Sequence, residues 1–341
     1  MKRCLVLIWL SLALVVSSSC AQQAVYEKHQ HYFFGTFDTI ITLIGYTQSA
    51  EEFETYASLA QSEMTRYHEI FDQYNAYEGV DNLYKLNQNA PDGYTHAEPE
   101  LIDLLLKVRD WQTLYSTGTN PAMGSVLRLW HNARTDTTYV PDEQSLAAAA
   151  EHTDYADVLI DENAGTVLYA DPSLQLDLGA VAKGYAAQKV ADKLREEGLS
   201  SFILNAGGNV ICGDAPRDGR AQWTVAVEDV DGVSTRLKLG LKNLSIVTSG
   251  DYQRYYEING QRYHHLIDPV TLYPAAHMRS VSVIHPDSGL ADFLSTAAFV
   301  LPYEESRALI ESVPEAEASW LFADGSEAFT DGFLDLMELV K

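Results

Sequence analysis

Apolar residues recur along this chain with two spacings, and the two spacings predict a mixture of helices and strands. Recurrence every three to four residues predicts helices over residues 50–74, 99–117, 142–151, 180–197, 290–300 and 304–312. Short runs that alternate or are rich in β-branched residues predict strands over residues 32–45, 157–161, 166–169, 202–204, 222–228, 235–241, 244–248 and 280–284, with a hairpin over 318–329. No internal repeat interrupts the pattern, and 341 residues are enough for one large domain or two smaller ones.

The stretch 176–214 places several distinctive residues around one predicted helix. Asp177 lies just before the helix, Lys183 lies in its first turn, and the next strand runs into Asn205 and the pair Gly207-Gly208. A lysine near the positive end of the helix dipole is unfavourable unless an anion binds there too, and free backbone N–H groups together with a lysine suit phosphate. The glycines would let the backbone approach a ligand closely. The residues alone leave two interpretations: a phosphate site, or a solvated lysine beside an ordinary loop.

A second candidate binding segment lies at the end of the predicted strand that begins at Leu244. Thr248, Ser249 and Gly250 close this strand, and Tyr252 follows two residues later. Hydroxyls and free N–H groups beside a glycine suit an anion or a ribityl chain. An ordinary Ser-Gly-Asp turn is the alternative interpretation, because such turns are common.

The third candidate segment contains the adjacent histidines His264 and His265, followed by Asp268. On a strand, only one of two adjacent side chains can face a given side. A histidine here could serve chemistry or simply satisfy a backbone carbonyl. A zinc site is the weaker interpretation, because no third and fourth ligand stand at a sensible spacing.

The fourth candidate is a polar pair on the predicted helix 290–300. Asp292 and Thr296 are spaced i and i+4, so both lie on one face of an otherwise apolar helix. A carboxylate with a hydroxyl oxygen suits Mg²⁺, which takes one or two protein oxygens and completes its shell with substrate phosphates and water. The alternative is a capping aspartate and a threonine bonded back to its own helix.

The net charge of the chain limits the kinds of molecule that it can bind. The formal net charge is −25, and the hydrophobic and charged fractions of 46% and 21% are ordinary for a globular protein. An acidic surface argues against nucleic acid or an anionic membrane as a partner. An anionic ligand would therefore need a locally positive site or a bridging metal cation.

The first twenty residues resemble a bacterial lipoprotein signal. Lys2 and Arg3 precede an apolar run over residues 5–16, and small residues lead to Cys20, which would carry the lipid. Ordinary cleavage after Ala21 is the alternative. Residues 21–31 are expected to form a polar tether, and Cys212 is left without a disulfide partner, which favours a small buried residue.

The motifs together resemble the ApbE family, the FAD:protein FMN transferases. The resemblance is carried by DLGAVAKGYAAQKVADKL and NAGGNVICGD within residues 177–214, and by the segments around Thr248, His265 and Asp292. It covers residues 32–329. The chain departs from the family pattern where Phe34 replaces Met, Asp72 replaces Ser, Leu272 replaces Gly, and the loop after Gly118 loses a Phe and an Asp.

The resemblance implies an α+β fold, with one T-fold-related catalytic domain of mixed or antiparallel sheets flanked by helices over residues 32–341. It implies FAD as substrate, Mg²⁺ as cofactor, and transfer of the FMN moiety to a Ser or Thr hydroxyl of a partner flavoprotein in a membrane redox complex, with release of AMP. With the signal at residues 1–20, it implies an exported bacterial lipoprotein, anchored in the membrane and facing the periplasm.

The resemblance also assigns the site residues. The implied flavin-nucleotide contacts are Gly35, Thr36, Tyr74, Asp177, Lys183, Asn205, Gly207, Gly208, Thr248, Ser249, Gly250, Tyr252 and His265. The implied metal ligands are Asp292, Thr296 and the backbone carbonyl of Ala180. Either His265 or Asp268 would orient the substrate or assist proton transfer.

Three rival functions stay open at this point. Water could replace the acceptor hydroxyl, which would make the protein an FAD pyrophosphatase that produces FMN and AMP. The chain could instead be a non-catalytic FAD-binding lipoprotein, or an acidic lipoprotein that binds other surface components. An intact Asp292 and Thr296 disfavour a carrier, because storage of FAD does not need a positioned Mg²⁺.

Overall fold

The computed structural model describes residues 25–337. The expected signal peptide over residues 1–20 and the lipidation of Cys20 lie outside the described residues. Within the described part of the chain, no helix combines the length and apolar character that crossing a membrane requires.

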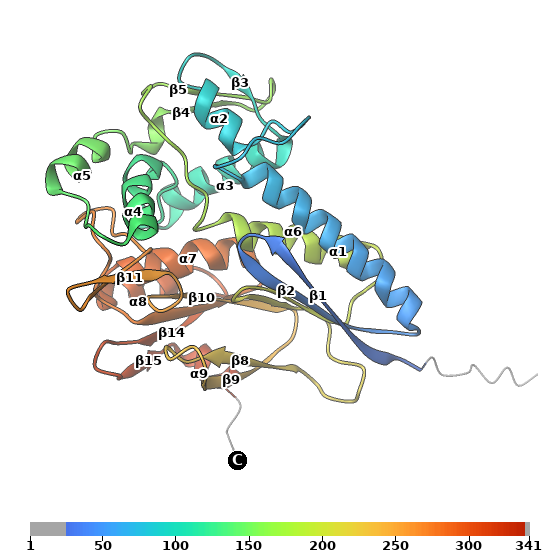
Figure 1. The fold of residues 1–341 in the computed structure, drawn as a ribbon. Coiled ribbons are helices and arrows are strands. Elements are labelled where there is room, and N and C mark those ends of the chain that lie inside the picture. Colours follow the sequence, from blue (N-terminus) through green and yellow to red (C-terminus); the bar gives the residue numbers. More distant parts are fainter. Residues whose placement is uncertain (1–24, 338–341) are drawn as a thin grey trace, which may run out of the picture.

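An eight-stranded sheet forms the centre of the fold (Figure 1). Its strand order is β1-β2-β6-β7-β10-β13-β14-β15, and each of its strand pairs is antiparallel. The strands are β1 Glu27–Thr36, β2 Thr39–Thr47, β6 Phe202–Ala206, β7 Asn209–Cys212, β10 Leu244–Gly250, β13 Ser280–His285, β14 Glu317–Leu321 and β15 Glu327–Phe329.

Helices cover one face of this sheet, and a small hairpin covers the other (Figure 1). The helical face holds α1 Ala50–Phe71, α6 Ala182–Glu196, α7 Ser288–Val300 and α8 Tyr303–Ser312. The opposite face holds the hairpin of β8 Trp223–Glu228 and β9 Thr235–Leu241, together with α9 Asp331–Leu336. Trp223, Leu239 and Phe333 are buried there against Cys212 and Ile246 of the main sheet.

A second group of elements stands beside the helical face. It contains α2 Leu83–Asn89, β3 Thr95–His96, α3 Pro99–Leu114, α4 Gly124–Asp136, α5 Glu143–Ala150, the 3₁₀ helix Tyr155–Asp157, β4 Val158–Asp161 and β5 Thr166–Tyr169. The hairpin of β11 Tyr255–Ile258 and β12 Gln261–His264 lies next to α4, where Tyr256 and Trp130 share one apolar cluster.

The α+β fold of antiparallel sheets flanked by helices is confirmed, and most predicted elements are present. The expected tether was wrong from residue 27 onward, because Glu27–His31 is the first half of β1 and pairs with β2. The His29 ring stacks on Phe53 of α1 at 5.4 Å, so the inward positions of this half-strand are histidines, which a search for apolar alternation does not detect.

One helix boundary and one whole helix also differ from the expectation. Helix α1 ends at Phe71 and not at residue 74, because the Asp72 carboxylate accepts hydrogen bonds from the Tyr74 and Asn75 amides at 2.6 and 3.2 Å and starts a new turn. Helix α4 was not predicted at all. From the sequence we expect only a loop after Gly118, where the structure has this helix.

Candidate active site

A cavity of about 640 Å³ lies between the two groups of elements. It is lined by the tip of the β1–β2 hairpin, the end of α1, the loop before α4, the start of α6, the end of β10 and one face of α7. The cavity brings together Tyr74, Asp177, Ala180, Lys183, Gly207, Thr248, Ser249, Gly250, His265, Asp292 and Thr296 of the predicted site residues.

The inner end of the cavity, which we define as Ala180, Lys183, Asp292 and Thr296, lies where α6 meets α7. Asp292 is only 5% exposed, and its Oδ2 accepts a hydrogen bond from the Gly184 amide at 2.7 Å. A Cβ atom at Gly184 would lie 2.5 Å from both the Asp292 Cβ and the Ser288 carbonyl oxygen. Only glycine lets the first turn of α6 come this close to α7.

The electrostatics of the inner end favour a positively charged ligand. Burial raises the pKa of Asp292, while the Lys183 ammonium and the hydrogen bond from Gly184 oppose that rise. The Lys183 ammonium donates to the Asn209 side-chain oxygen. A buried carboxylate is stabilised by a cation or by donated hydrogen bonds, so this group is suited to hold a metal ion.

The donor set at the inner end fits Mg²⁺. It offers one carboxylate on Asp292, one hydroxyl on Thr296 and a backbone carbonyl on the lining residue Ala180, all of them hard oxygen atoms. Across residues 25–337, no group of three or more His, Cys, Asp or Glu residues forms a ready-made metal centre. An ion bound here would depend on substrate oxygens and water for the rest of its shell, which is how Mg²⁺ is usually bound.

The hydroxyls at the end of β10 are held by buried serines. Thr248 Oγ1 lies 2.8 Å from Ser282 Oγ of β13, and Ser249 Oγ lies 2.8 Å from Ser295 Oγ of α7. These pairs fix both hydroxyls at the cavity wall, where each keeps further hydrogen-bonding capacity for a ligand.

Hydrogen bonds hold the segment that places Asp177 at the cavity wall. The side chain of buried Asn87 accepts a hydrogen bond from the Leu176 amide and donates one to the Leu176 carbonyl, both at 2.9 Å. The Asp177 carboxylate itself accepts from Gln73 Nε2 at 2.6 Å and from the Gly179 amide at 2.8 Å. The segment is therefore pinned on both sides of the aspartate.

The two adjacent histidines, His264 at the end of β12 and His265 just after it, have different surroundings. His264 is buried with Nε2 at 2.9 Å from the Ala275 carbonyl oxygen, so it has a structural role. His265 lines the cavity, its Nδ1 has no hydrogen-bond partner among the described residues, and burial together with Arg254 lowers its pKa to about 3. His265 is thus a neutral imidazole that faces the substrate space.

The mouth of the cavity, which we define as Tyr74, His131, Arg134 and Arg254, is its more exposed end. Tyr74 is 56% exposed, and its ring stacks on His131 at 5.1 Å. Arg134 Nη2 lies 3.4 Å from His131 Nδ1. Sequence reasoning found only Tyr74 here, because α4 was expected to be a loop and no local motif joins residues 131, 134 and 254.

Several predicted contacts lie outside the lining of the cavity. Gly35 and Thr36 precede the lining residues Phe37–Thr39, and Asn205 Oδ1 accepts from the Gly208 amide at 3.2 Å within the β6–β7 turn. The Asp268 carboxylate accepts from the Val270 amide at 2.8 Å and closes a surface turn, while the Tyr252 hydroxyl lies among Glu228, Arg236 and Asp251. The residues placed outside are Gly35, Thr36, Asn205, Gly208, Tyr252 and Asp268.

Comparison with known proteins identifies relatives of this arrangement. A model of the ApbE family matches residues 37–320. The FAD:protein FMN transferase of Treponema pallidum is 37% identical over 236 residues, which is 65% of this chain and 65% of that protein. The FAD:protein FMN transferase of Klebsiella pneumoniae is 34% identical over 202 residues, with 58% of this chain and 61% of that protein covered.

Solved structures share the fold. The crystal structure of the ApbE protein from Thermotoga maritima superposes with a TM-score of 0.83 at 27% identity, covering 92% of this chain and 100% of that one. The flavin transferase ApbE from Vibrio cholerae superposes with a TM-score of 0.78 at 24% identity, covering 91% of this chain and 100% of that one.

Proposed function

The chain belongs to the ApbE family, and we propose that it is an FAD:protein FMN transferase, which moves the FMN moiety of FAD to a Ser or Thr hydroxyl of an acceptor protein and releases AMP. The names of the Treponema and Klebsiella relatives support this activity. The observation that carries the proposal is the inner end of the cavity, where Asp292, Thr296 and Lys183 come together beside room for a nucleotide.

Mg²⁺ bound by Asp292, Thr296 and the Ala180 carbonyl would neutralise the pyrophosphate charge and activate its phosphorus. Lys183 adds a second positive charge at the same end. The hydroxyls of Thr248 and Ser249 and the ring of Tyr74 offer contacts for the ribityl chain and for a planar ring.

The reaction is a displacement at the FMN phosphorus. The acceptor oxygen forms a new bond to that phosphorus, and the bond from the phosphorus to the bridging oxygen breaks, so that AMP leaves with the bridging oxygen. The acceptor hydroxyl loses one proton in this exchange. His265 lines the cavity as a neutral imidazole with a lowered pKa, so it is suited to orient the hydroxyl by a hydrogen bond and not to hold the proton.

We further propose that the acceptor is a flavoprotein subunit of a membrane redox complex, and that the protein acts outside the cytoplasmic membrane. The signal-like residues 1–20, with Cys20 as the predicted site of lipidation, support this location. An anchored enzyme would meet acceptor segments that face the periplasm.

The test is to incubate the purified protein with FAD, Mg²⁺ and a peptide that carries one Ser or Thr acceptor. Mass spectrometry follows the peptide, and chromatography follows the nucleotides. A peptide that gains one FMN, with equimolar AMP, supports the proposal if the reaction also stops on chelation and in Asp292→Ala. Glu305→Ala, on the exposed side of α8, is the matched control and should keep full activity.

Other products would replace the proposal with a rival. Free FMN and AMP beside an unmodified peptide would identify an FAD pyrophosphatase. FAD that stays intact but bound would identify a carrier.

A further inference from the structure

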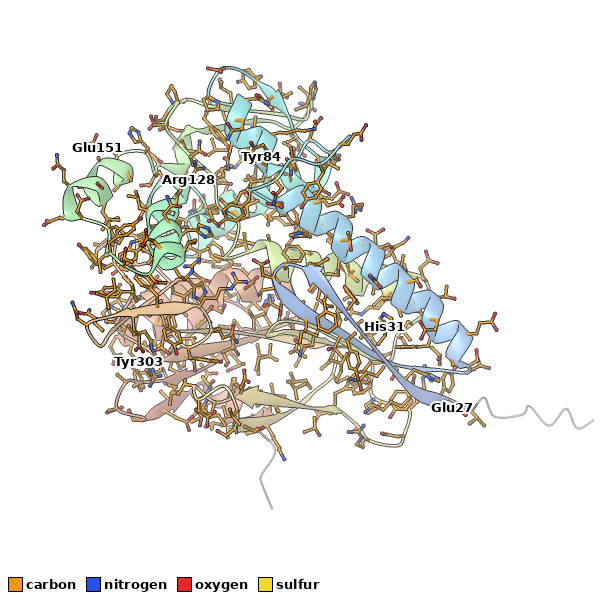
Figure 2. The ribbon with its side chains drawn as sticks, viewed as in Figure 1. Glu27, His31, Tyr84, Arg128, Glu151 and Tyr303 are labelled. Atoms are coloured by element: carbon orange, nitrogen blue, oxygen red, sulfur yellow. The ribbon has the colours of Figure 1, made fainter. Side chains whose placement is uncertain are left out.

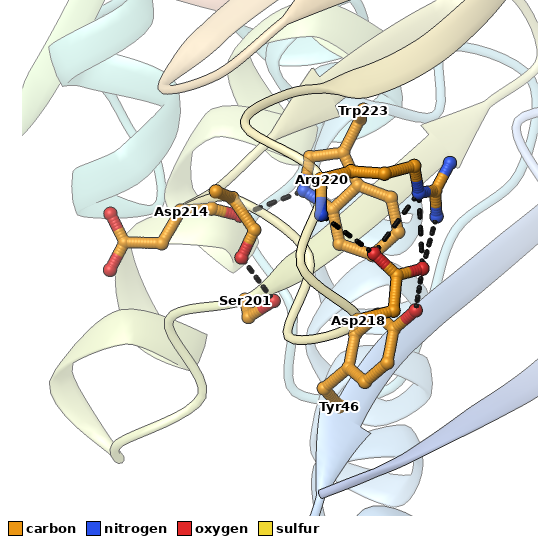
Figure 3. A network of polar contacts seen from close by, with 7 residues as sticks. Tyr46, Ser201, Asp214, Asp218, Arg220 and Trp223 are labelled. Carbon is orange, nitrogen blue, oxygen red and sulfur yellow. Dashed lines mark hydrogen bonds and ion pairs between the residues drawn. The ribbon is translucent and has the colours of Figure 1, made fainter.

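Most arginines of this acidic chain lie in ion pairs with carboxylates. Arg220 is typical, with Nη2 at 2.7 Å from Asp218 Oδ2, which also accepts a hydrogen bond from Tyr46 (Figure 3). The arginines with such pairs are Arg66, Arg195, Arg220, Arg236, Arg262, Arg279 and Arg307. Within residues 25–337, five arginines have no ion pair with a carboxylate, namely Arg109, Arg128, Arg134, Arg217 and Arg254, and of these only Arg134 and Arg254 line the cavity.

The two guanidinium groups belong to separate segments of the chain, and both residues line the same cavity. Arg134 belongs to the last turn of α4, and Arg254 lies between β10 and β11. The backbone of Arg254 is held at the cavity wall, where its carbonyl accepts a hydrogen bond from the His265 amide at 3.1 Å. Burial and then the charge of Arg254 lower the pKa of Arg134, as expected for two like charges that border one cavity. A pair of like charges without a carboxylate between them is a place where an anion would be stabilised.

The acids nearest to this pair do not neutralise it. The charge of Asp177 raises the pKa of Arg134, but among the described residues neither Asp177 nor Asp38 forms an ion pair with Arg134 or Arg254. Both oxygens of Asp177 already accept hydrogen bonds, from Gln73 and from the Gly179 amide. The two guanidinium groups of the mouth therefore keep donors for a ligand anion, because the Asp177 oxygens bond other groups.

FAD does not supply an anion for this second site. Its negative charges lie on the pyrophosphate, which the proposed function assigns to the inner end, and its adenine and isoalloxazine rings are neutral near pH 7. The acceptor polypeptide is the other substrate, and a carboxylate side chain is the anion that a polypeptide most commonly offers. Guanidinium groups bind carboxylates through paired, charge-assisted hydrogen bonds.

We propose that Arg134 and Arg254 form a subsite for the carboxylate of an Asp or Glu that flanks the Ser or Thr to be modified in the acceptor. This inference rests on the proposed transferase function. The protein has a net charge of −25, so its overall field repels an acidic acceptor segment. The two arginines of the subsite would attract such a segment locally. Arg254 is exposed and would meet the acceptor first, while the half-buried Arg134 would fix its position.

The experiment compares two peptides of equal length that differ only in one flanking Asp, replaced by Asn in the second. FMN transfer is measured with the wild type, Arg134→Gln, Arg254→Gln and the double variant. Arg128→Gln is the matched control, because Arg128 lies on the same helix (Figure 2), donates to Gln175 at 2.9 Å and does not line the cavity.

We expect each substitution to raise the KM of the Asp peptide roughly tenfold, as the loss of one charge-assisted contact predicts. The KM of the Asn peptide, the KM of FAD and the kcat should change little. Raised salt should increase the KM of the Asp peptide more than that of the Asn peptide. This difference should appear only in proteins that keep both arginines. Equal KM values for the two peptides in the wild type, or an equal rise in the KM of FAD, would overturn the subsite.

A binding measurement separates this inference from the proposed function. Fluorescence anisotropy of the labelled peptides is measured with the FAD-saturated protein. If the Asp peptide binds more tightly than the Asn peptide, and the double variant removes that preference, the subsite stands even where no FMN is transferred. If transfer proceeds but the preference is absent, the transferase stands and the subsite is wrong.

Discussion

The inner end and the mouth of the cavity are built in opposite ways. The inner end lies where α6 packs on α7, its Asp292 is buried, and the short contact through Gly184 sets its geometry. The mouth comes from three segments far apart in the sequence, Tyr74 and Arg254 in it are exposed, and Tyr74 and Arg134 both contact His131 through side chains. This difference suggests that the inner end provides rigid positioning for chemistry, whereas the mouth provides recognition that can vary between relatives.

Substitution of Asp292 by Asn should have the largest effect and would separate function from stability at the inner end. Asn keeps the shape and can accept the Gly184 hydrogen bond, but it removes the charge that attracts a cation. We expect the rate of FMN transfer to fall by about 100-fold to 1,000-fold, as for the loss of one preorganised electrostatic group. The free energy of unfolding without metal should not fall, because a buried charge is removed.

Thermal unfolding with and without Mg²⁺ and FAD checks the same variant. The wild type should gain stability on addition of the ligands, and Asp292→Asn should gain much less. A variant that transfers FMN at the wild-type rate would show that the inner end does not hold the catalytic charge.

Substitution of Gly184 by Ala tests whether close packing defines the inner end. The added methyl group would overlap Asp292 and the Ser288 carbonyl, so α6 and α7 would have to separate. We expect a loss of about 3 kcal/mol in the free energy of unfolding, with loss of activity in the part that stays folded. Gly93→Ala is the control, since open space surrounds that position, and urea unfolding should show it nearly unchanged. A stable, active Gly184→Ala protein would contradict the rigid inner end.

The sequence was sufficient to select the residues that line the inner end, because they lie in short contiguous motifs. Asp292 and Thr296 share one helix face, and Lys183 stands in the first turn of its predicted helix, so local spacing was sufficient to group them. The need for Gly184 was not visible, because it depends on how closely a second helix approaches.

The mouth could not be predicted, because tertiary structure alone brings its residues together. Arg134 and Arg254 are separated by more than one hundred positions, and nothing near either residue in the sequence distinguishes it from a solvated arginine. The fold shows the same division. Regular apolar periods gave most helices and strands, whereas the start of β1 was missed because histidines fill its inward positions.

Substitution of Asn87 by Ala tests the anchoring of Leu176 and Asp177, the segment that contributes to the wall of the cavity. Asn87 is 3% exposed and bonds both backbone groups of Leu176 and the Tyr169 hydroxyl, all within 2.9 Å. We expect a loss of about 2 to 3 kcal/mol in the free energy of unfolding, because buried backbone groups lose their partners. Urea unfolding measures this loss, and Asn89→Ala, at the end of the same helix, serves as the control. An unchanged stability would mean that water replaces the lost side chain.

Substitution of His265 by Gln tests the pH dependence of the cavity wall. Burial lowers the pKa of His265 to about 3 from the ordinary value of 6.5. Between these values the unfolded chain binds a proton that the folded chain does not, so the free energy of unfolding falls as the pH falls through this window. His265→Gln should therefore lose less stability than the wild type between pH 6.5 and about 4. Chemical unfolding across this range checks the difference, and His96→Gln, at an exposed position, should follow the wild type.

Substitution of Leu272 by Gly should have the smallest effect and concerns the loop behind the mouth. Leu272 stands where the family pattern has Gly and keeps a left-handed backbone with φ of 64°, while its carbonyl accepts a hydrogen bond from Trp130 Nε1 at 2.8 Å. Glycine would relieve a backbone strain of about 1 to 2 kcal/mol, but it would lose partly buried packing and would raise the entropy of the unfolded chain. We expect these terms to cancel to within about 1 kcal/mol.

Urea unfolding of Leu272→Gly beside Asn259→Gly makes the test decisive. Asn259 also has a left-handed backbone, with φ of 53°, but it lies in the exposed β11–β12 turn, and asparagine tolerates this conformation. Asn259→Gly should therefore change stability even less. If Leu272→Gly instead loses much more stability and also raises the KM of the acceptor, the Leu272 side chain supports the mouth, and that end of the cavity would share the rigidity of the inner end.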